Sequence, residues 1–371
     1  FQVPTNVDVR ATPAIADIDG DGKLEIVTVS SGSLIAFEND GTLKWNGQAI
    51  QGNSGESVAI ADVDNDGDVE ILVAGSLFDH MGQLIWQRAG ANSYSASTMA
   101  DLAGDGDLEI VLGKSAYHHS GVVYYDNLEI ASGYPQIANL DSDPEPEILI
   151  TNPQGLSLLN HDGSTIYKNL TPTGDPSGGL TWVRPATIHD FDGDDVAEYA
   201  MSSGGHYTVY EADGTITWSA DVLDSTGLAA GTAVDFLGDG KAEAMYADET
   251  RFFIFDSQGD VLLEIPRASR TITEYPVVAD IDNDGSAEVV VVSNETLSSV
   301  ANSPTVQVVR DVQDRWVQAR RIWNQHTYHV TNVREDSTIP PVQKRSWEYL
   351  ITYRTNTQIG LEGDCVPEPP R

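Results

Sequence analysis

The sequence predicts an all-β fold, a seven-bladed β-propeller with an acidic loop in each blade, and three observations support this prediction. One acidic nonapeptide recurs seven times, and consecutive copies start 38 to 51 residues apart. Short small-and-apolar or β-branched runs flank each copy, and glycine-containing turns separate these runs. The repeat length matches one four-stranded blade, and a ring of blades leaves only short strand edges exposed.

The expected elements follow one order within each repeat. A short strand such as residues 14–16 precedes the acidic loop, and a β-branched run such as residues 26–29 follows it. A third strand, a turn near Asp-Gly and a fourth strand complete the unit, and the fourth strand often ends in an aromatic residue such as Trp45 or Trp218. Short strands with regular glycine-containing turns are typical of all-β domains. One blade cannot bury its faces alone, so we expect the ring to fold as one domain.

The repeats begin near residues 11, 56, 95, 134, 184, 229 and 274, and we expect the propeller to span residues 1–330. Residues 331–371 are expected to form a C-terminal extension and a proline-rich tail that pack on the propeller or leave it. Before this boundary, a basic and aromatic cluster runs from Arg315 to His329. Two segments are candidates for the outermost strand of blade seven, residues 316–322 and residues 2–9, and the sequence favours neither.

The charge of the chain limits its partners. There are 57 acidic and 20 basic residues, which give a formal net charge of -37. A field of this sign repels nucleic acids and anionic membranes, so neither is an expected partner. No apolar run is long enough for a membrane-spanning helix, so we expect no direct membrane insertion. The chain starts at Phe1 and holds one cysteine, Cys365. We expect it to be a processed or excised piece of a larger protein with flanking domains.

The repeated loop has the residue types of a calcium site. In the pattern DxDxDGxxE, the carboxylates at positions 1, 3, 5 and 9 and the backbone carbonyl at position 7 converge, while glycine at position 6 permits a sharp turn. Hard oxygen donors in this number suit Ca²⁺ better than Mg²⁺, which prefers a strict octahedron. The seven loops contain 29 of the 57 acidic residues. Two carboxylates about 4 Å apart repel by roughly 1 kcal/mol in water and about 4 kcal/mol at an effective dielectric of 20.

We therefore expect about five to seven Ca²⁺ ions to be held by these loops. The predicted ligands of the first four loops are Asp17, Asp19, Asp21, Lys23, Glu25, Asp62, Asp64, Asp66, Asp68, Glu70, Asp101, Asp105, Asp107, Glu109, Asn139, Asp141, Asp143, Glu145 and Glu147. Those of the last three loops are Asp190, Asp192, Asp194, Val196, Glu198, Asp235, Asp239, Lys241, Glu243, Asp280, Asp282, Asp284, Ser286 and Glu288.

The seven loops are not equivalent. Those that begin at Asp17, Asp62, Asp190 and Asp280 carry all four carboxylates. The loop at Asn139 has an amide at position 1 and Pro144 at position 6, yet it keeps three acids. The loops at Asp101 and Asp235 have Ala103 and Leu237 at position 3 and lose one ligand each. We expect these two loops to bind calcium more weakly or to use water or a carbonyl instead.

With these motifs, residues 10–310 or so resemble the FG-GAP/VCBS repeat family, whose propellers are related to the head of the integrin α chain. The resemblance implies a seven-bladed ring with Ca²⁺ between the first and second strands of each blade, where the metal stabilises the fold. Residues 320–333 are also similar to a stretch that follows such repeats in large secreted or surface bacterial proteins. Calcium sites of this kind suit millimolar extracellular calcium, so we expect an extracellular, secreted or cell-surface protein.

Three functions fit these features. The first is a binding or adhesion module that holds a glycan or protein ligand, with Tyr94, Tyr117, Trp182 and Tyr207 as candidate contacts. The second is a polysaccharide lyase, which needs a base near an arginine. Its candidate residues are Tyr117, His118, His119, Trp182, Arg184, His206, Tyr207 and the cluster from Arg315 to His329. The third is a structural spacer. No GxSxG, HExxH or P-loop motif occurs, so we expect no enzyme activity.

Overall fold

The computed structural model describes residues 2–3, 5–50, 57–88, 96–141, 143–172, 184–225, 229–270, 274–294 and 303–357. Cys365 and the proline-rich tail lie outside these ranges. Among the described residues, the one helix is a single 3-10 turn, η1 (Ser346–Glu348). No helix in these ranges has the length and apolar character needed to cross a lipid bilayer.

Twenty-seven strands form seven antiparallel sheets. Blade one contains β1 (Ala14–Ala16), β2 (Glu25–Ser30), β3 (Ser33–Phe37) and β4 (Leu43–Ala49). Blade two contains β5 (Ala59–Ala61), β6 (Glu70–Val73), β7 (Ser76–Phe78) and β8 (Leu84–Gln87). Blade three contains β9 (Thr98–Ala100), β10 (Glu109–Val111), β11 (Ser115–Tyr117) and β12 (Val123–Asp126). Blade four contains β13 (Tyr134–Ala138), β14 (Glu147–Asn152), β15 (Gly155–Asn160) and β16 (Thr165–Leu170).

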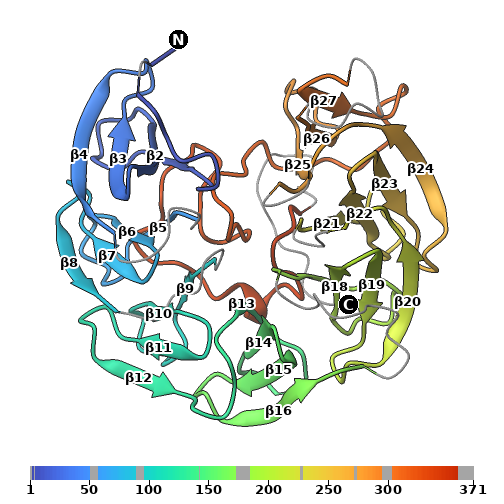
Figure 1. The fold of residues 1–371 in the computed structure, drawn as a ribbon, viewed down its shortest axis with the longest axis horizontal. Helices are drawn as coiled ribbons and strands as arrows, with labels where there is room; N and C mark the ends of the chain where they lie inside the picture. The colour runs from blue at the N-terminus through green and yellow to red at the C-terminus, as the bar shows by residue number, and fades with distance from the viewer. Residues whose placement is uncertain are drawn as a thin grey trace.

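The remaining blades follow the same order along the chain. Blade five contains β17 (Thr187–His189), β18 (Glu198–Ser203), β19 (His206–Tyr210) and β20 (Ile216–Asp221). Blade six contains β21 (Thr232–Val234), β22 (Glu243–Ala247), β23 (Arg251–Phe255) and β24 (Val261–Pro266). Blade seven contains β25 (Val277–Ala279), β26 (Glu288–Val292) and β27 (Val306–Val309). The sheets stand around a common axis with their first strands innermost (Figure 1), so the prediction of a seven-bladed β-propeller is confirmed.

Blade seven differs from the others because its sheet has three strands. Neither predicted segment supplies a fourth strand in the described part of the chain, and both expectations were wrong. Residues 316–322 lie between blades six and seven, where Val317 N–H donates to Phe236 O and its carbonyl accepts from Ala287. At the N-terminus, Asp8 N–H donates to Val29 O, which places this segment on β2 of blade one.

Neighbouring blades are joined by a repeated contact between an outer strand and a turn. In blades two to six, the glycine of the β-hairpin that leads into the fourth strand has a positive φ and lies against a large side chain of the preceding blade. A Cβ added to Gly82 would lie 2.9 Å from Trp45, and one added to Gly163 would lie 2.3 Å from Tyr125. The aromatic residues that end the fourth strands therefore pack against the next blade, and only glycine fits at the turn.

The Gly163→Ala substitution tests this contact. The new methyl group would collide with Tyr125 at a φ of +80°, so we expect a loss of about 2–4 kcal/mol of unfolding free energy from strain and overpacking. Gly32→Ala is the matched control, because Gly32 has a φ of +76° and no atom within 4 Å of an added Cβ. Equal losses in urea unfolding would contradict the account.

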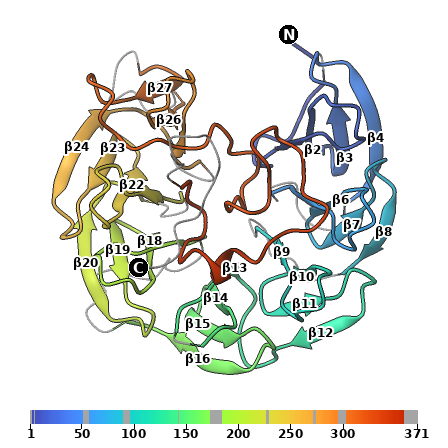
Figure 2. The ribbon, with the colours of Figure 1, turned by 180° about the vertical axis from the view of Figure 1, so that it is seen from behind.

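The C-terminal segment fills the axis of the ring. Residues 316–356 cross the centre of the face that is nearest the viewer in Figure 2. Their hydrogen bonds reach Ile15 of blade one, Ile60 of blade two, Thr98 of blade three, Ile188 of blade five, Thr232 of blade six and Val278 of blade seven. In blade four, η1 lies against β13. This segment therefore contacts the innermost strand of every blade and joins the ring from inside.

Part of the predicted basic cluster organises this segment. The guanidinium of Arg320 is 2% exposed and donates to Tyr328 Oη, Val330 O and Val333 O. Trp323 stacks on Tyr328 at 4.8 Å and lies 5.9 Å from Tyr275 of blade seven, while it also packs against the core of blades one and two. These residues cover the seam between the first and last blades.

A buried histidine makes this segment sensitive to acid. His329 Nδ1 lies 3.1 Å from Thr327 O, which can only accept, so Nδ1 carries the proton and Nε2 accepts from Gln343. Burial lowers the pKa of His329 to about 4. Because the folded pKa lies below the ordinary value near 6.5, this group's contribution to stability is complete above pH 6.5 and is lost as the pH falls towards 4.

We therefore expect His329 to cost about 2 kcal/mol of unfolding free energy between pH 7 and pH 5. The His329→Gln variant should lose this part of the pH dependence, even if it is less stable at pH 7. His161→Gln, in the turn between β15 and β16, is the control. Parallel stability curves for wild type and His329→Gln in urea unfolding between pH 5 and pH 8 would contradict the assignment.

Candidate metal centres

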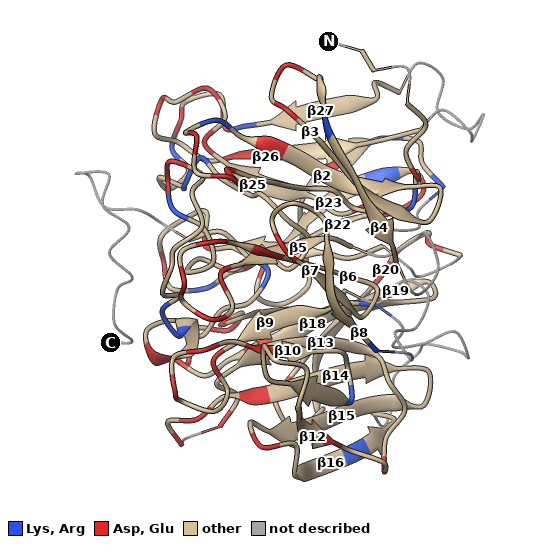
Figure 3. Cartoon of the chain, turned by 90° about the vertical axis from the view of Figure 1, so that its left-hand side faces the viewer, with Lys and Arg blue, Asp and Glu red and all other residues tan. Residues whose placement is uncertain are grey.

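The seven acidic loops lie on one face of the ring. Each loop connects the first strand of a blade to the second, and the glutamate at position 9 is the first residue of that second strand in all seven blades. The side view in Figure 3 shows most of the Asp- and Glu-rich turns along its left-hand edge. The C-terminal segment crosses the same face. The repeat therefore gathers the surplus negative charge on one side of the molecule.

Backbone amides preorganise each loop around its own carboxylates. The position 5 side chain accepts a hydrogen bond from the amide of position 7 in every loop, as in Val196 N to Asp194 Oδ1 at 2.9 Å. Position 1 accepts from amides further along the loop, as in Gly193 N to Asp190 Oδ1 at 2.6 Å. Gly67 and Gly285 at position 6 have φ of 95° and 96°, in agreement with the predicted sharp turn.

The glutamate at position 9 anchors each loop to its sheet. All seven of these glutamates are buried, and one carboxylate oxygen accepts the amide of position 2 at 2.7 to 3.0 Å. The other oxygen is buried without a hydrogen-bond partner in Glu25, Glu198 and Glu288. Asp62 Oδ1 and Asp192 Oδ1 are buried and unpartnered in the same way. Buried carboxylate oxygens without partners are costly, and a cation in the loop would satisfy them.

The pKa values of the glutamates at position 9 also indicate that the loops fit a cation. Burial raises the pKa of Glu70 and Glu198 to about 8, and that of Glu147 and Glu243 to about 7. The neighbouring aspartates of each loop raise these pKa values further, because like charges disfavour ionisation. A cation would reverse both effects and favour the ionised carboxylates. The loops thus fit a divalent metal ion in charge, burial and donor type.

Five loops bring their ligand atoms together within 4.8 Å of one another. The five groups are Asp17, Asp19 and Glu25; Asp62, Asp64 and Asp66; Asp141, Asp143 and Glu147; Asp190, Asp192, Asp194 and Glu198; and Asp280, Asp282 and Glu288. Four of these loops carry all the expected carboxylates, and the fifth is the loop with Asn139. Among the described residues, the loops at Asp101 and Asp235 form no such group, which agrees with their missing ligand. The carbonyls of position 7 stay a prediction.

Protein cations enter some of the loops. Lys44 Nζ lies 2.6 Å from Asp19, 3.0 Å from Glu38 and 3.5 Å from Glu25. Burial alone would lower the pKa of Lys44, but these carboxylates outweigh it and raise the pKa. In blade seven, Arg310 Nη1 lies 3.0 Å from Asp282. A metal ion at either loop would therefore share its carboxylates with a basic side chain.

The loop at Asp101 is closed by other parts of the protein. Arg345 Nε, from the C-terminal segment, lies 3.0 Å from Asp101 Oδ2, and Asp101 Oδ1 accepts the amides of Gly104 and Asp105. His118 Nδ1 lies 2.8 Å from Glu109 Oε1, while the other oxygen of Glu109 accepts two amides. All four oxygens of these two acids have protein partners, so neither acid offers an unpaired oxygen to a metal.

The loop at Asp235 is held by its own backbone. Both oxygens of Asp235 accept amides, from Gly238, Asp239 and Gly240, at 2.6 to 3.1 Å. Leu237, at the position of the missing carboxylate, is 64% exposed. Asp17, Asp190 and Asp280 accept amides through both oxygens in the same way, so the missing carboxylate at position 3 is what distinguishes the loop at Asp235, and its weaker binding stays a prediction.

The structure does not bring the other candidate residues together. Tyr207 is completely buried and stacks on Tyr246 at 4.7 Å, so it is a core residue and the expectation of a ligand contact was wrong. Tyr117 packs against Trp86, and His206 lies 3.1 Å from Asp221 at the edge of blade five. Arg184 is completely buried. Tyr94 and Trp182 lie outside the described residues.

Lys44, Arg310 and Arg345 are residues of these loops that sequence reasoning missed, and His118 was predicted only as a lyase candidate, not as a partner of Glu109. Lys44 immediately precedes the aromatic residue of its fourth strand, and this position could have suggested that it faces the loop. His118 and Arg310 similarly lie in or near hairpins of their own blades. Arg345 is 244 residues from Asp101 in the sequence, and no local pattern predicts that contact.

The fold and its acidic loops define a class of protein, the β-propellers with charged turns on one face. Within this class, residues 17–73 match the sequence model of the FG-GAP-like repeat, and the resemblance to FG-GAP repeats is thereby confirmed. No curated protein sequence matches the chain significantly.

Solved structures share the fold at low sequence identity. The biofilm matrix protein Bap1 of V. cholerae has 20% identity and a TM-score of 0.78, with 95% of this chain and 86% of that chain covered. BamB from Moraxella catarrhalis has 14% identity and a TM-score of 0.52, with coverage of 79% and 84%. A rhamnogalacturonan lyase from Bacillus licheniformis has 17% identity and a TM-score of 0.45, with coverage of 83% and 74%. These likenesses establish the propeller fold alone, and the last is too weak to support an argument.

Two substitutions distinguish an open loop from a closed one. Glu198→Gln removes a carboxylate with an unpartnered oxygen, so we expect the calcium-induced rise in melting temperature to fall by roughly 2 °C or more. Glu109→Gln is the control and should leave that rise unchanged, because both oxygens of Glu109 are bonded within the protein. Calorimetry with calcium and with chelator measures both, and similar effects of the two variants would contradict the assignment.

Proposed function

We propose that this chain is a calcium-stabilised extracellular binding module of the adhesion type. The observation that carries the proposal is the set of buried carboxylate oxygens without hydrogen-bond partners in the loops at Asp62, Asp190 and Asp280, together with Glu25 of the loop at Asp17, whose free oxygen has only an ion pair with Lys44 at 3.5 Å. Together with the loop at Asn139, these would hold five Ca²⁺ ions, while the loops at Asp101 and Asp235 would hold none. The ions would neutralise the loops and stabilise the fold, because bound metal contributes to folding free energy.

The proposed location follows from the metal. Carboxylate loops that share some of their oxygens with lysine or arginine suit the millimolar calcium outside cells. The likeness of fold to a biofilm matrix protein supports the same location. Strong net negative charge keeps such a module soluble.

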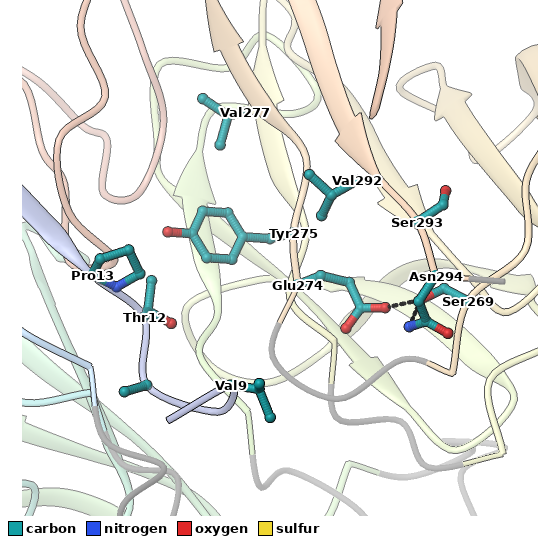
Figure 4. Close-up of a pocket in the computed structure, with 11 residues that line it drawn as sticks. Val9, Thr12, Pro13, Ser269, Glu274, Tyr275, Val277, Val292, Ser293 and Asn294 are labelled. Atoms are coloured by element: carbon teal, nitrogen blue, oxygen red, sulfur yellow. Dashed lines mark hydrogen bonds between the residues drawn. The ribbon is translucent and has the colours of Figure 1, made fainter. Parts of the chain in front are cut away.

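We place the ligand in a cleft between blades seven and one, on the face opposite the acidic loops. This cleft has a volume of about 440 Å³, and Figure 4 shows the side chains that line it. The ring of Tyr275 points across the space towards Thr12 and Pro13, and Glu274 and Asn294 are held near each other by Ser269. An aromatic side chain beside carboxylate, amide and hydroxyl groups suits a sugar, whose hydroxyl groups form hydrogen bonds, and Arg354 and Arg267 hold Tyr275 and Glu274 in place. A glycan is therefore the proposed ligand, with a protein ligand as the alternative.

We propose no catalysis at this site. Lyase chemistry needs a base within hydrogen-bond reach of the sugar and a cation that neutralises its carboxylate. His206 and His118 are paired with Asp221 and Glu109 on separate blades, and Arg184 is buried. No observation favours a lyase over a binding module, and the cleft gives the binding module an advantage over a spacer.

A glycan array tests the proposal. We expect the calcium-loaded protein to capture a defined class of glycans, and chelator to reduce the capture because the fold loosens. Glu274→Gln should reduce capture at least tenfold, whereas Glu348→Gln on the opposite face should leave it unchanged. Capture of no glycan in either buffer would contradict the glycan proposal.

A further inference from the structure

The outer edge of blade seven differs from that of every other blade. In six sheets a fourth strand covers the third, but β27 is itself the outermost strand of its sheet. Val306 is 54% exposed and Val308 is 50% exposed. In the covered third strands, Leu34 of β3 is 0% exposed and Phe253 of β23 is 5% exposed. β27 is therefore the third strand of its blade, but it is exposed because no fourth strand among the described residues covers it.

The hydrogen bonds show which groups of β27 are available. Ser293 N–H donates to Thr305 O at 2.8 Å, so Thr305, Gln307 and Val309 direct their backbone groups towards β26. The alternate residues Val306 and Val308 then direct their N–H and C=O groups outward. Nothing within the described ranges pairs with these outward backbone groups.

This edge also lacks the usual protection. Exposed edge strands are normally guarded by charged residues or proline, which discourage pairing with another chain. Five of the six outermost strands of the other blades contain a charged residue, for example Lys44 in β4 and Lys168 in β16. β27 reads Val-Gln-Val-Val and contains none. An apolar, unguarded edge is a template for an added strand.

The contacts of the rest of the chain limit which segment could pair with the free edge of β27. The described N-terminal residues lie on β2, and residues 316–356 lie on the axis, so both are engaged elsewhere. A second copy would bring another formal charge of -37. Charge complementarity to this net negative charge instead favours a partner strand with basic residues.

We propose that β27 binds an extended strand of a partner protein, which pairs antiparallel to it through main-chain hydrogen bonds. The six existing fourth strands are antiparallel to their third strands, and they present alternate apolar or aromatic side chains inward. The partner strand would therefore be neutral or basic, with alternating apolar residues and an aromatic near its end. This mode of recognition takes affinity from the backbone and specificity from alternate side chains. The proposal does not depend on the metal sites or on the glycan cleft.

A labelled peptide with the sequence of residues 41–49, Gly-Thr-Leu-Lys-Trp-Asn-Gly-Gln-Ala, is the probe. Fluorescence anisotropy with the whole chain should show saturable binding. Val308→Pro removes an outward amide without touching the ladder to β26, and should lower the affinity at least tenfold. Val308→Thr is the matched control, with an expected change below threefold.

A second experiment tests modified peptides against the wild-type protein. Peptides with N-methyl groups on alternate residues of one edge or of the other should differ at least tenfold in affinity, because only one edge faces β27. Amide hydrogen exchange should show protection of Val306 and Val308 on peptide binding. Absence of saturable binding, or equal affinity of both methylated peptides, would overturn the proposal. A wild-type dimer that Val308→Pro dissociates would also overturn it, because a second copy would then occupy the edge.

Discussion

The buried glutamate at the start of each second strand is the constraint on which the rest of this structure depends. One of its oxygens accepts a hydrogen bond from the amide of loop position 2, the second residue after the first strand, and this bond fixes the loop to the sheet. Its burial places a negative charge beside two or three aspartates, and Glu70 and Glu198 consequently have a pKa of about 8. A cation in the loop would favour the ionised glutamate; in the loop at Asp235, where no cation is proposed, Glu243 has a pKa of about 7 and would be partly protonated at neutral pH. Lys44, Arg345 and a divalent ion are three ways to meet the same electrostatic requirement.

The C-terminal segment closes the ring by binding to the inner strands at its axis. Its first and last blades share no sheet in the described part of the chain, and the C-terminal segment instead bonds to inner strands around the ring. Arg345 belongs to this segment and also neutralises the loop at Asp101, so ring closure and charge compensation use the same stretch of chain. The outer edge of blade seven is left uncovered as a consequence, and the cleft beside Tyr275 lies at the same seam. Both candidate interaction sites thus arise where the repeat is incomplete.

The repeat made much of this architecture predictable from sequence. Each acidic loop marks one blade, and the β-branched runs and turn glycines mark its strands, because all of these are local patterns. The inequality of the loops was also predictable, since Ala103 and Leu237 stand where a carboxylate is needed. The course of residues 316–356 was not predictable, because these residues have no periodicity and their partners lie on strands distant in sequence. For the same reason the contact of Arg345 was missed, and Tyr207, a candidate ligand contact, is instead buried against Tyr246.

The central claim is that five of the seven loops hold calcium and that two are complete without it. The number of ions bound per chain tests this claim most directly. Equilibrium dialysis against about 5 mM calcium, followed by elemental analysis, measures that number on the folded protein. The account predicts five ions per chain. A value of seven would show that Arg345 and the turn at Asp235 do not exclude metal, and a value near zero would contradict the cation requirement itself.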